Sequence, residues 1–219
     1  MNLLPVTIVD DFFKDPDYIR SEALNLEFST GGNAPGPRAI CPENISKIVA
    51  KKLFALLIDM NKHIVQGQLE LHFQLTKKDF EYGWVHSDVN ETYFAGVIYL
   101  TPNAPLSGGT AMYKPVDNNL DFNLYGSLQN IKKDFYTGKT NDLEQFKEAR
   151  EKNNSLFYKT IEVSNVYNRL VMYPVNEFHS ENKLFGTTKD DARLTLVFFV
   201  SSIASDSMFP IDRMNFVGE

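Results

Sequence analysis

The sequence of 219 residues has a single cysteine, Cys41, so no disulfide can form within the chain. One free cysteine is typical of a protein from a reducing compartment. Long apolar runs are also missing, and the longest, Leu194–Val200, is too short to span a bilayer. The first residues lack the basic start and apolar core of a signal peptide. We therefore expect a soluble, cytoplasmic protein with no membrane partner.

An excess of positive charge is absent as well, because the formal net charge is -6. Proteins that bind nucleic acid over a broad surface carry a basic patch, so nucleic acid is not expected as a partner. Histidine is scarce, with only 4 residues, whereas Phe (17) and Tyr (10) are abundant. Aromatic side chains pack well on pleated surfaces, which favours a sheet-rich core.

The first third of the chain is predicted to be mainly helical. Asp15 followed by Pro16 is a helix start signal, and apolar residues continue that helix to about Phe28. A loop rich in Gly and Pro follows at 31–37. A second helix is predicted over Pro42–His63, where apolar residues recur at helical spacing. We interpret these helices as packing on the outside of a sheet.

From Gln68 the apolar period changes to two, as on a strand with one buried face: Leu69, Leu71, Phe73 and Leu75 alternate with polar residues. Further strands are predicted at Tyr93–Leu100, Thr110–Lys114, Phe157–Val163, Arg169–Tyr173 and Leu194–Ser201. A polar insertion, Pro115–Ser155, lies between them and contains a predicted helix at Asn141–Glu151.

Helices followed by many strands predict an α+β domain, whose strands can close into a double-stranded β-helix, or jelly roll. We expect one domain over residues 1–219. Its parts would be a mainly helical region at 1–66, a jelly-roll core at 67–203 with the insertion near 115–155, and a C-terminal tail at 204–219.

The first chemical signal is the pair His86 and Asp88. Residues two apart on an extended segment point to the same face, so both side chains can reach one metal ion. An imidazole and a carboxylate suit iron(II), and a second histidine would complete a facial triad with open positions. His179, just beyond an apolar strand that starts at Arg169, is the candidate. A solvated strand end is the alternative for the pair alone.

Arg193 begins an otherwise apolar strand, where its charge is costly to bury without an anionic partner. Guanidinium binds carboxylate in a bidentate fork, and the terminal carboxylate of 2-oxoglutarate is one such partner. Thr195 lies on the same face and offers a hydroxyl. The alternative for Arg193 is an ordinary salt bridge to Asp190, Asp191 or Glu181.

Together these residues resemble the Fe(II)/2-oxoglutarate-dependent dioxygenase superfamily, and more closely its prolyl-hydroxylase-like branch. The resemblance covers roughly Gln68 to Ser201, interrupted by the insertion. In chain order it comprises His86-Ser87-Asp88, the strand Ala95–Thr101, the turn Ser107–Thr110, His179, and Arg193-Leu194-Thr195.

The resemblance implies that His86, Asp88 and His179 ligate iron. It also implies a clamp for the distal carboxylate of 2-oxoglutarate, made by Arg193, the Tyr99 hydroxyl and, more loosely, Thr195. The cofactors would be Fe(II), 2-oxoglutarate as co-substrate, and O₂. The turn Gly108-Gly109 would let the backbone bend near the site, or serve simply as a hairpin turn.

The implied activity is hydroxylation of an unidentified small-molecule or peptide substrate, with decarboxylation of 2-oxoglutarate to succinate. The insertion either shapes the substrate entrance or decorates the outside. Trp84 and Tyr82 either line the substrate channel or belong to the core. His63 and His72 are assigned surface or hydrogen-bonding roles.

Two other functions remain open. One is a non-catalytic jelly-roll protein that binds a metal or a small acid. The other is a cupin-type metalloenzyme that does not use 2-oxoglutarate. An anion clamp at Arg193 and Tyr99 distinguishes the oxygenase from both.

Overall fold

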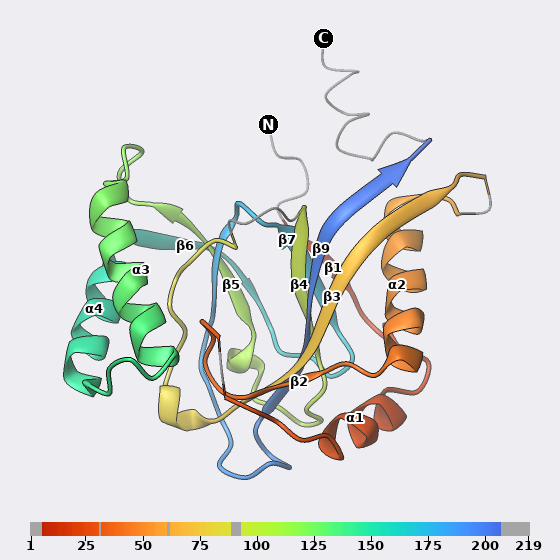
Figure 1. Ribbon diagram of the computed structural model, residues 1–219, viewed down its shortest axis with the longest axis horizontal. Helices are drawn as coiled ribbons and strands as arrows, with labels where there is room; N and C mark the ends of the chain where they lie inside the picture. The colour runs from red at the N-terminus through yellow and green to blue at the C-terminus, as the bar shows by residue number, and fades with distance from the viewer. Residues whose placement is uncertain (1–5, 31, 61, 89–92, 207–219) are drawn as a thin grey trace.

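The computed structural model describes residues 6–30, 32–60, 62–88 and 93–206, and two antiparallel sheets form its centre (Figure 1). The six-stranded sheet has the order β1-β7-β4-β9-β3-β2, with bounds β1 Thr7–Val9, β2 Arg38–Ile40, β3 Val65–Thr76, β4 Phe94–Tyr99, β7 Leu170–Pro174 and β9 Arg193–Ser205. The three-stranded sheet has the order β6-β5-β8, with bounds β5 Thr110–Pro115, β6 Phe157–Val163 and β8 Phe178–Glu181. The helices are α1 Pro16–Leu24, α2 Glu43–Leu57, α3 Phe122–Tyr136 and α4 Leu143–Ser155. Mixed helices and antiparallel sheets confirm the α+β class.

The first two helices lie against the six-stranded sheet, on the side away from α3 and α4 (Figure 1). The Asp15 side chain accepts a hydrogen bond from the Tyr18 amide and so caps α1, as the sequence predicts. Along α2 the residues Ile45, Val49 and Leu53 are fully buried and belong to the same core cluster as the sheet residues. Both helices are shorter than predicted, since α1 ends at Leu24 and α2 at Leu57.

The sequence prediction for β3 holds for one face and is wrong for the other. Leu71, Phe73 and Leu75 are buried toward α2, as expected. Gln74 and Thr76 were expected on an exposed polar face, yet they are buried too. Each donates to the Pro35 carbonyl oxygen, so the preceding loop covers this second face. Here the polar alternation marks a buried polar interior instead of a solvated surface.

The insertion folds into two helices, α3 and α4, that pack together beside β5 and β6 (Figure 1). The helix α3 was missed by the sequence analysis, whereas α4 matches the predicted helical segment with later bounds. Leu128 of α3 and Phe146 of α4 bury Trp84 in a small cluster of their own. The Asn153 side chain donates to the Val85 carbonyl at 2.9 Å, so the insertion is tied directly to the segment that carries His86.

Within the described ranges, no helix has both the length and the apolar character needed to cross a membrane.

Candidate metal centre

His86 and His179 come from segments far apart in the chain that pair as antiparallel backbone. The His86 amide donates to the His179 carbonyl at 3.0 Å, and the His179 amide donates to the His86 carbonyl at 2.8 Å. This reciprocal pair sets the two rings side by side, with centroids 4.5 Å apart. His179 was expected just beyond the strand that starts near Arg169. It lies instead within β8, a separate short strand of the other sheet, because a turn follows Pro174.

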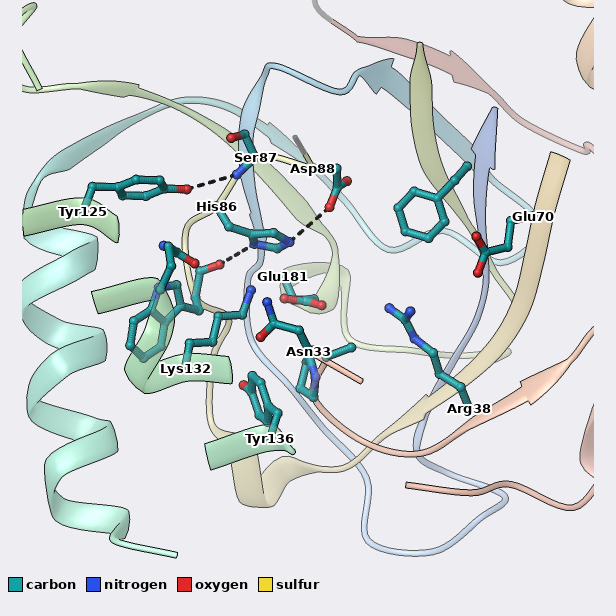
Figure 2. A pocket seen from close by; sticks show the side chains of 15 residues that line it. Asn33, Arg38, Glu70, His86, Ser87, Asp88, Tyr125, Lys132, Tyr136 and Glu181 are labelled. Carbon is teal, nitrogen blue, oxygen red and sulfur yellow. Dashed lines mark hydrogen bonds and ion pairs between the residues drawn. The ribbon is translucent and has the colours of Figure 1, made fainter. Parts of the chain in front are cut away.

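The carboxylate of Asp88 faces the Nε2 atoms of both rings. Its oxygens lie 3.6 Å from His86 Nε2 and 3.4 Å from His179 Nε2 (Figure 2). One ligand atom from each of the three residues falls within 4.8 Å of the others. The Asp88 amide donates to the Val175 carbonyl at 3.0 Å, which fixes the backbone that carries the carboxylate. The three predicted residues are therefore brought together in a group that could hold a metal ion.

The second nitrogen of each imidazole contacts a backbone carbonyl. His86 Nδ1 lies 2.7 Å from the Trp84 oxygen, and His179 Nδ1 lies 3.0 Å from the Glu177 oxygen. A carbonyl can only accept, so both Nδ1 atoms carry hydrogen and both Nε2 lone pairs face the shared space. Such outer hydrogen bonds orient imidazole ligands in metal sites. The orientation of both rings fits a metal bound through Nε2.

The electrostatics of the cluster also fit metal binding. Burial, and then the neighbouring positive charge of Lys132, lower the pKa of His86 well below its usual value. Ligation needs the neutral imidazole, so the lowered pKa favours the binding form. Two imidazoles and one carboxylate are a donor set that suits iron(II) and leaves coordination positions open. Within the described ranges this is the only such cluster.

The two remaining histidines lie outside the cluster. His63 Nδ1 is 3.3 Å from the Asp206 carboxylate, and His72 Nε2 is 2.6 Å from the Glu70 carboxylate. These contacts agree with the hydrogen-bonding roles expected for both.

Arg193, the first residue of β9, is 1% exposed. Its Nε donates to the Gly108 carbonyl at 3.0 Å, while its Nη2 is buried with no hydrogen-bond partner. The alternative salt bridge to Asp190, Asp191 or Glu181 is not found in the part of the chain that the structure describes. A buried guanidinium without an anionic partner is costly, and an anion that reached Nη2 would offset this cost.

Thr195 and Tyr99 lie beside Arg193. Thr195 pairs with Tyr99 in the β4–β9 ladder, and its Oγ1 is buried without a hydrogen-bond partner. The Tyr99 hydroxyl donates to Thr110 Oγ1 at 2.8 Å, and its ring centroid is 5.5 Å from the Arg193 guanidinium carbon. The three predicted clamp residues therefore form one buried polar group.

A small cavity of about 50 Å³ joins this polar group to the metal cluster. Arg193 and Thr110 line one part of it, and His86, Asp88 and His179 line another. An anion bound by Arg193 would thus occupy the same cavity as the metal ligands.

His86 and Asp88 also line a larger cavity of about 470 Å³ (Figure 2). We call it the outer cavity; its remaining lining residues are Asn33, Ala34, Pro35, Arg38, Glu70, Trp84, Ser87, Tyr125, Gln129, Lys132, Tyr136, Glu181 and Phe199. Trp84 lines this cavity and is also a core residue, while its role in a substrate channel stays a prediction. Tyr82 does not line it, and packs against Arg150 with 3.9 Å between its ring centroid and the guanidinium carbon.

Two cationic residues of this cavity were missed by the sequence analysis. Arg38 of β2 donates through Nε and Nη2 to the Gln74 side-chain oxygen, at 3.2 and 3.1 Å. Lys132 of α3 is 2% exposed, and burial lowers its pKa to about 8. The helical spacing of Tyr125, Gln129 and Lys132 could have revealed a shared face, but only once α3 had been recognised as a helix.

The fold is similar to solved structures of 2-oxoglutarate oxygenases. A prolyl hydroxylase from Trichoplax adhaerens, in complex with a hypoxia inducible factor peptide fragment, matches with a TM-score of 0.54 and 13% identity, over 100% of this chain and 89% of that chain. HygX from Streptomyces hygroscopicus, with nickel and 2-oxoglutarate bound, matches with a TM-score of 0.52 and 11% identity, over 90% of this chain and 83% of that chain. At such identities the similarity concerns the fold alone.

Among curated proteins, none matches this sequence. A family model does match, over residues 2–200, and it therefore covers most of the chain. The chain belongs to the family of unknown function DUF6445.

Proposed function

We propose that this protein is an Fe(II)- and 2-oxoglutarate-dependent oxygenase whose two sheets form a jelly-roll core. The observation that carries the proposal is one cavity lined both by a His-Asp-His cluster and by a buried arginine without an anionic partner. The fold similarity adds support, because HygX was solved with nickel and 2-oxoglutarate bound.

His86, Asp88 and His179 would hold iron through two Nε2 atoms and one carboxylate oxygen. Three protein ligands leave positions open for the co-substrate and O₂. When bound, the metal supplies the oxidising chemistry that couples decarboxylation of 2-oxoglutarate to oxidation of a C–H bond. The protein contributes the orientation of the ligands and a cavity shared by the metal and the co-substrate.

Arg193 would bind the distal carboxylate of 2-oxoglutarate. Its unpartnered Nη2 and the unpartnered Thr195 hydroxyl are the groups that this carboxylate would satisfy. Thr110 lines the cavity and accepts the Tyr99 hydroxyl hydrogen, so Tyr99 would contribute to the clamp directly or by orienting Thr110. Charge-assisted hydrogen bonds to a buried guanidinium are among the strongest that a protein forms.

The test is an anaerobic titration of the iron(II)-loaded protein with 2-oxoglutarate, followed by the weak visible charge-transfer band of the chelate. We expect a saturable band in the wild type. In Arg193→Ala the band should be lost at the same concentration, while bound iron is unchanged. A protein that binds iron but gives no band would instead favour a cupin-type enzyme or a non-catalytic binding protein.

A further inference from the structure

The outer cavity contains a buried lysine that the proposed reaction does not use. Lys132 extends from α3 with its ammonium group directed toward His86 and Glu181 (Figure 2). It is 2% exposed, and in the described residues its Nζ has neither a hydrogen-bond partner nor an ion-pair partner. Glu181 and Asp88 lie near enough to influence it electrostatically, yet neither forms a salt bridge with it. A positive charge on a buried side chain is costly without an ion-pair partner.

The helix α3 presents Lys132 together with neutral polar groups. Tyr125, Gln129 and Tyr136 recur on the same helical face and line the same cavity. The Tyr125 hydroxyl lies 3.4 Å from the Ser87 amide, between the two predicted ligands of that segment. This face of the insertion therefore forms a wall of the cavity next to the metal cluster.

A second cation stands on the opposite wall. Arg38 extends from β2 into the same cavity, and Glu181 lies between it and Lys132 (Figure 2). The nearby carboxylate of Asp88 is committed to the metal cluster. Besides Asp88, the cavity is lined by two cations, the buried Lys132 and the half-buried Arg38, and by two acids, the central Glu181 and the exposed Glu70. The Glu70 carboxylate already contacts His72 at 2.6 Å, and no acid forms a salt bridge with Lys132 in the described part of the chain, so Lys132 can bind a further anion. A volume of about 470 Å³ is typical of a site for a small molecule.

We propose that the outer cavity binds the anionic group, a carboxylate or a phosphate, of a small acidic substrate, and that Lys132 forms the ion pair with it. The inference rests on the proposed function, since it places this substrate beside the iron. Lys132 lines the outer cavity and Arg193 lines the small cavity, and the two cavities adjoin at His86 and Asp88, which line both. The substrate and 2-oxoglutarate would therefore have separate cationic partners.

The test uses the full-length, iron(II)-loaded protein with saturating 2-oxoglutarate under anaerobic conditions, and measures the melting temperature. The probes are matched acids and neutral analogues: L-glutamate and L-glutamine, L-aspartate and L-asparagine, glucose 6-phosphate and glucose, AMP and adenosine. We expect at least one acid to raise the melting temperature by several degrees and its neutral analogue to have no effect. Carboxylates and phosphates in separate arms identify the preferred anionic group.

Two lysine variants make the test specific. In Lys132→Met the half-maximal acid concentration should rise by at least about ten-fold, because a buried ion pair is lost. Lys133→Met, the exposed neighbour on the same helix, should behave like the wild type. The inference is overturned if no acid shifts the melting temperature, if neutral analogues shift it equally, or if the acid effect survives in Lys132→Met.

The failure of the proposed function would look different. Suppose that the 2-oxoglutarate charge-transfer band is absent but an acid raises the melting temperature in a way that depends on Lys132. This result would disprove the oxygenase proposal and still support the anion site. A normal band without any effect of the acids would support the oxygenase and disprove the anion site.

Discussion

Replacing Lys132 with Met should make the protein more stable at neutral pH, although it removes the group proposed to bind the substrate. Burial lowers the pKa of Lys132 from 10.5 to about 8 in the folded protein. The difference of about 2.5 pKa units, at about 1.36 kcal/mol per unit, corresponds to a penalty of about 3 kcal/mol at pH 7. Met has a similar shape and carries no charge, so the variant avoids this penalty.

The sign of the effect sets its pH dependence. The folded pKa lies below the unfolded value, so the ammonium destabilises the fold fully below pH about 8. The penalty shrinks as pH rises from about 8 to about 10.5, because the folded lysine is then already neutral and the proton held by the unfolded lysine stabilises that state less and less. At pH 9.5 only about 1 kcal/mol of it should remain. The advantage of Lys132→Met over the wild type should shrink in the same way.

Urea unfolding followed by circular dichroism, with EDTA present to remove metal, measures this difference. At pH 7 the midpoint for Lys132→Met should lie about 1 M above that of the wild type, if the slope is about 3 kcal/mol per M. Lys133→Met should unfold like the wild type at both pH values. A variant that is less stable than the wild type at pH 7, or an advantage that does not shrink at pH 9.5, would refute the reasoning.

Three further predictions concern the metal cluster, the proposed 2-oxoglutarate clamp and the nearby turn at Gly109. His179→Ala should abolish turnover and leave the circular dichroism spectrum and melting temperature nearly unchanged, because this side chain serves the metal; undiminished activity would remove it from the triad. Arg193→Met should weaken 2-oxoglutarate binding at least about 100-fold by calorimetry, since a buried charged contact is lost; unchanged affinity would disprove the clamp. Gly109→Ala should lower stability by at least about 2 kcal/mol in thermal unfolding, because its Cβ would lie 1.8 Å from the Val163 oxygen; a neutral result would contradict this geometry.

Local rules of sequence explain why many elements were predictable. A capping Asp before Pro marks the start of α1, and period-two alternation marks β3. The predicted strand Phe157–Val163 has the same bounds as β6. The helix α3 was missed because its apolar pattern is weak, and only Leu128 among its apolar residues is fully buried. The short strand β1 was also missed, since three residues carry too little periodicity.

The candidate metal ligands and Arg193 could be picked out from the sequence because they follow one another in a recognisable order along the chain. His86, Asp88 and His179 meet in the structure, and Arg193 is buried beside them with an unpartnered nitrogen. The exact strand of His179 was not predictable, because a turn of three residues separates β7 from β8 and sends them to different sheets.

The sequence by itself determined the residue types that can bind a metal and a carboxylate, since ligand chemistry and two-residue spacing are local properties. Only the tertiary structure decided that Arg38 from β2 and Lys132 from the insertion face one cavity with His86 and Asp88. No periodic pattern within a single segment predicts that residues from these separate elements line one cavity. This arrangement depends on how α3 and α4 pack over the segment before Asp88, through Trp84 and the hydrogen bond from Asn153 of α4 to Val85, and on how β2 pairs with β3.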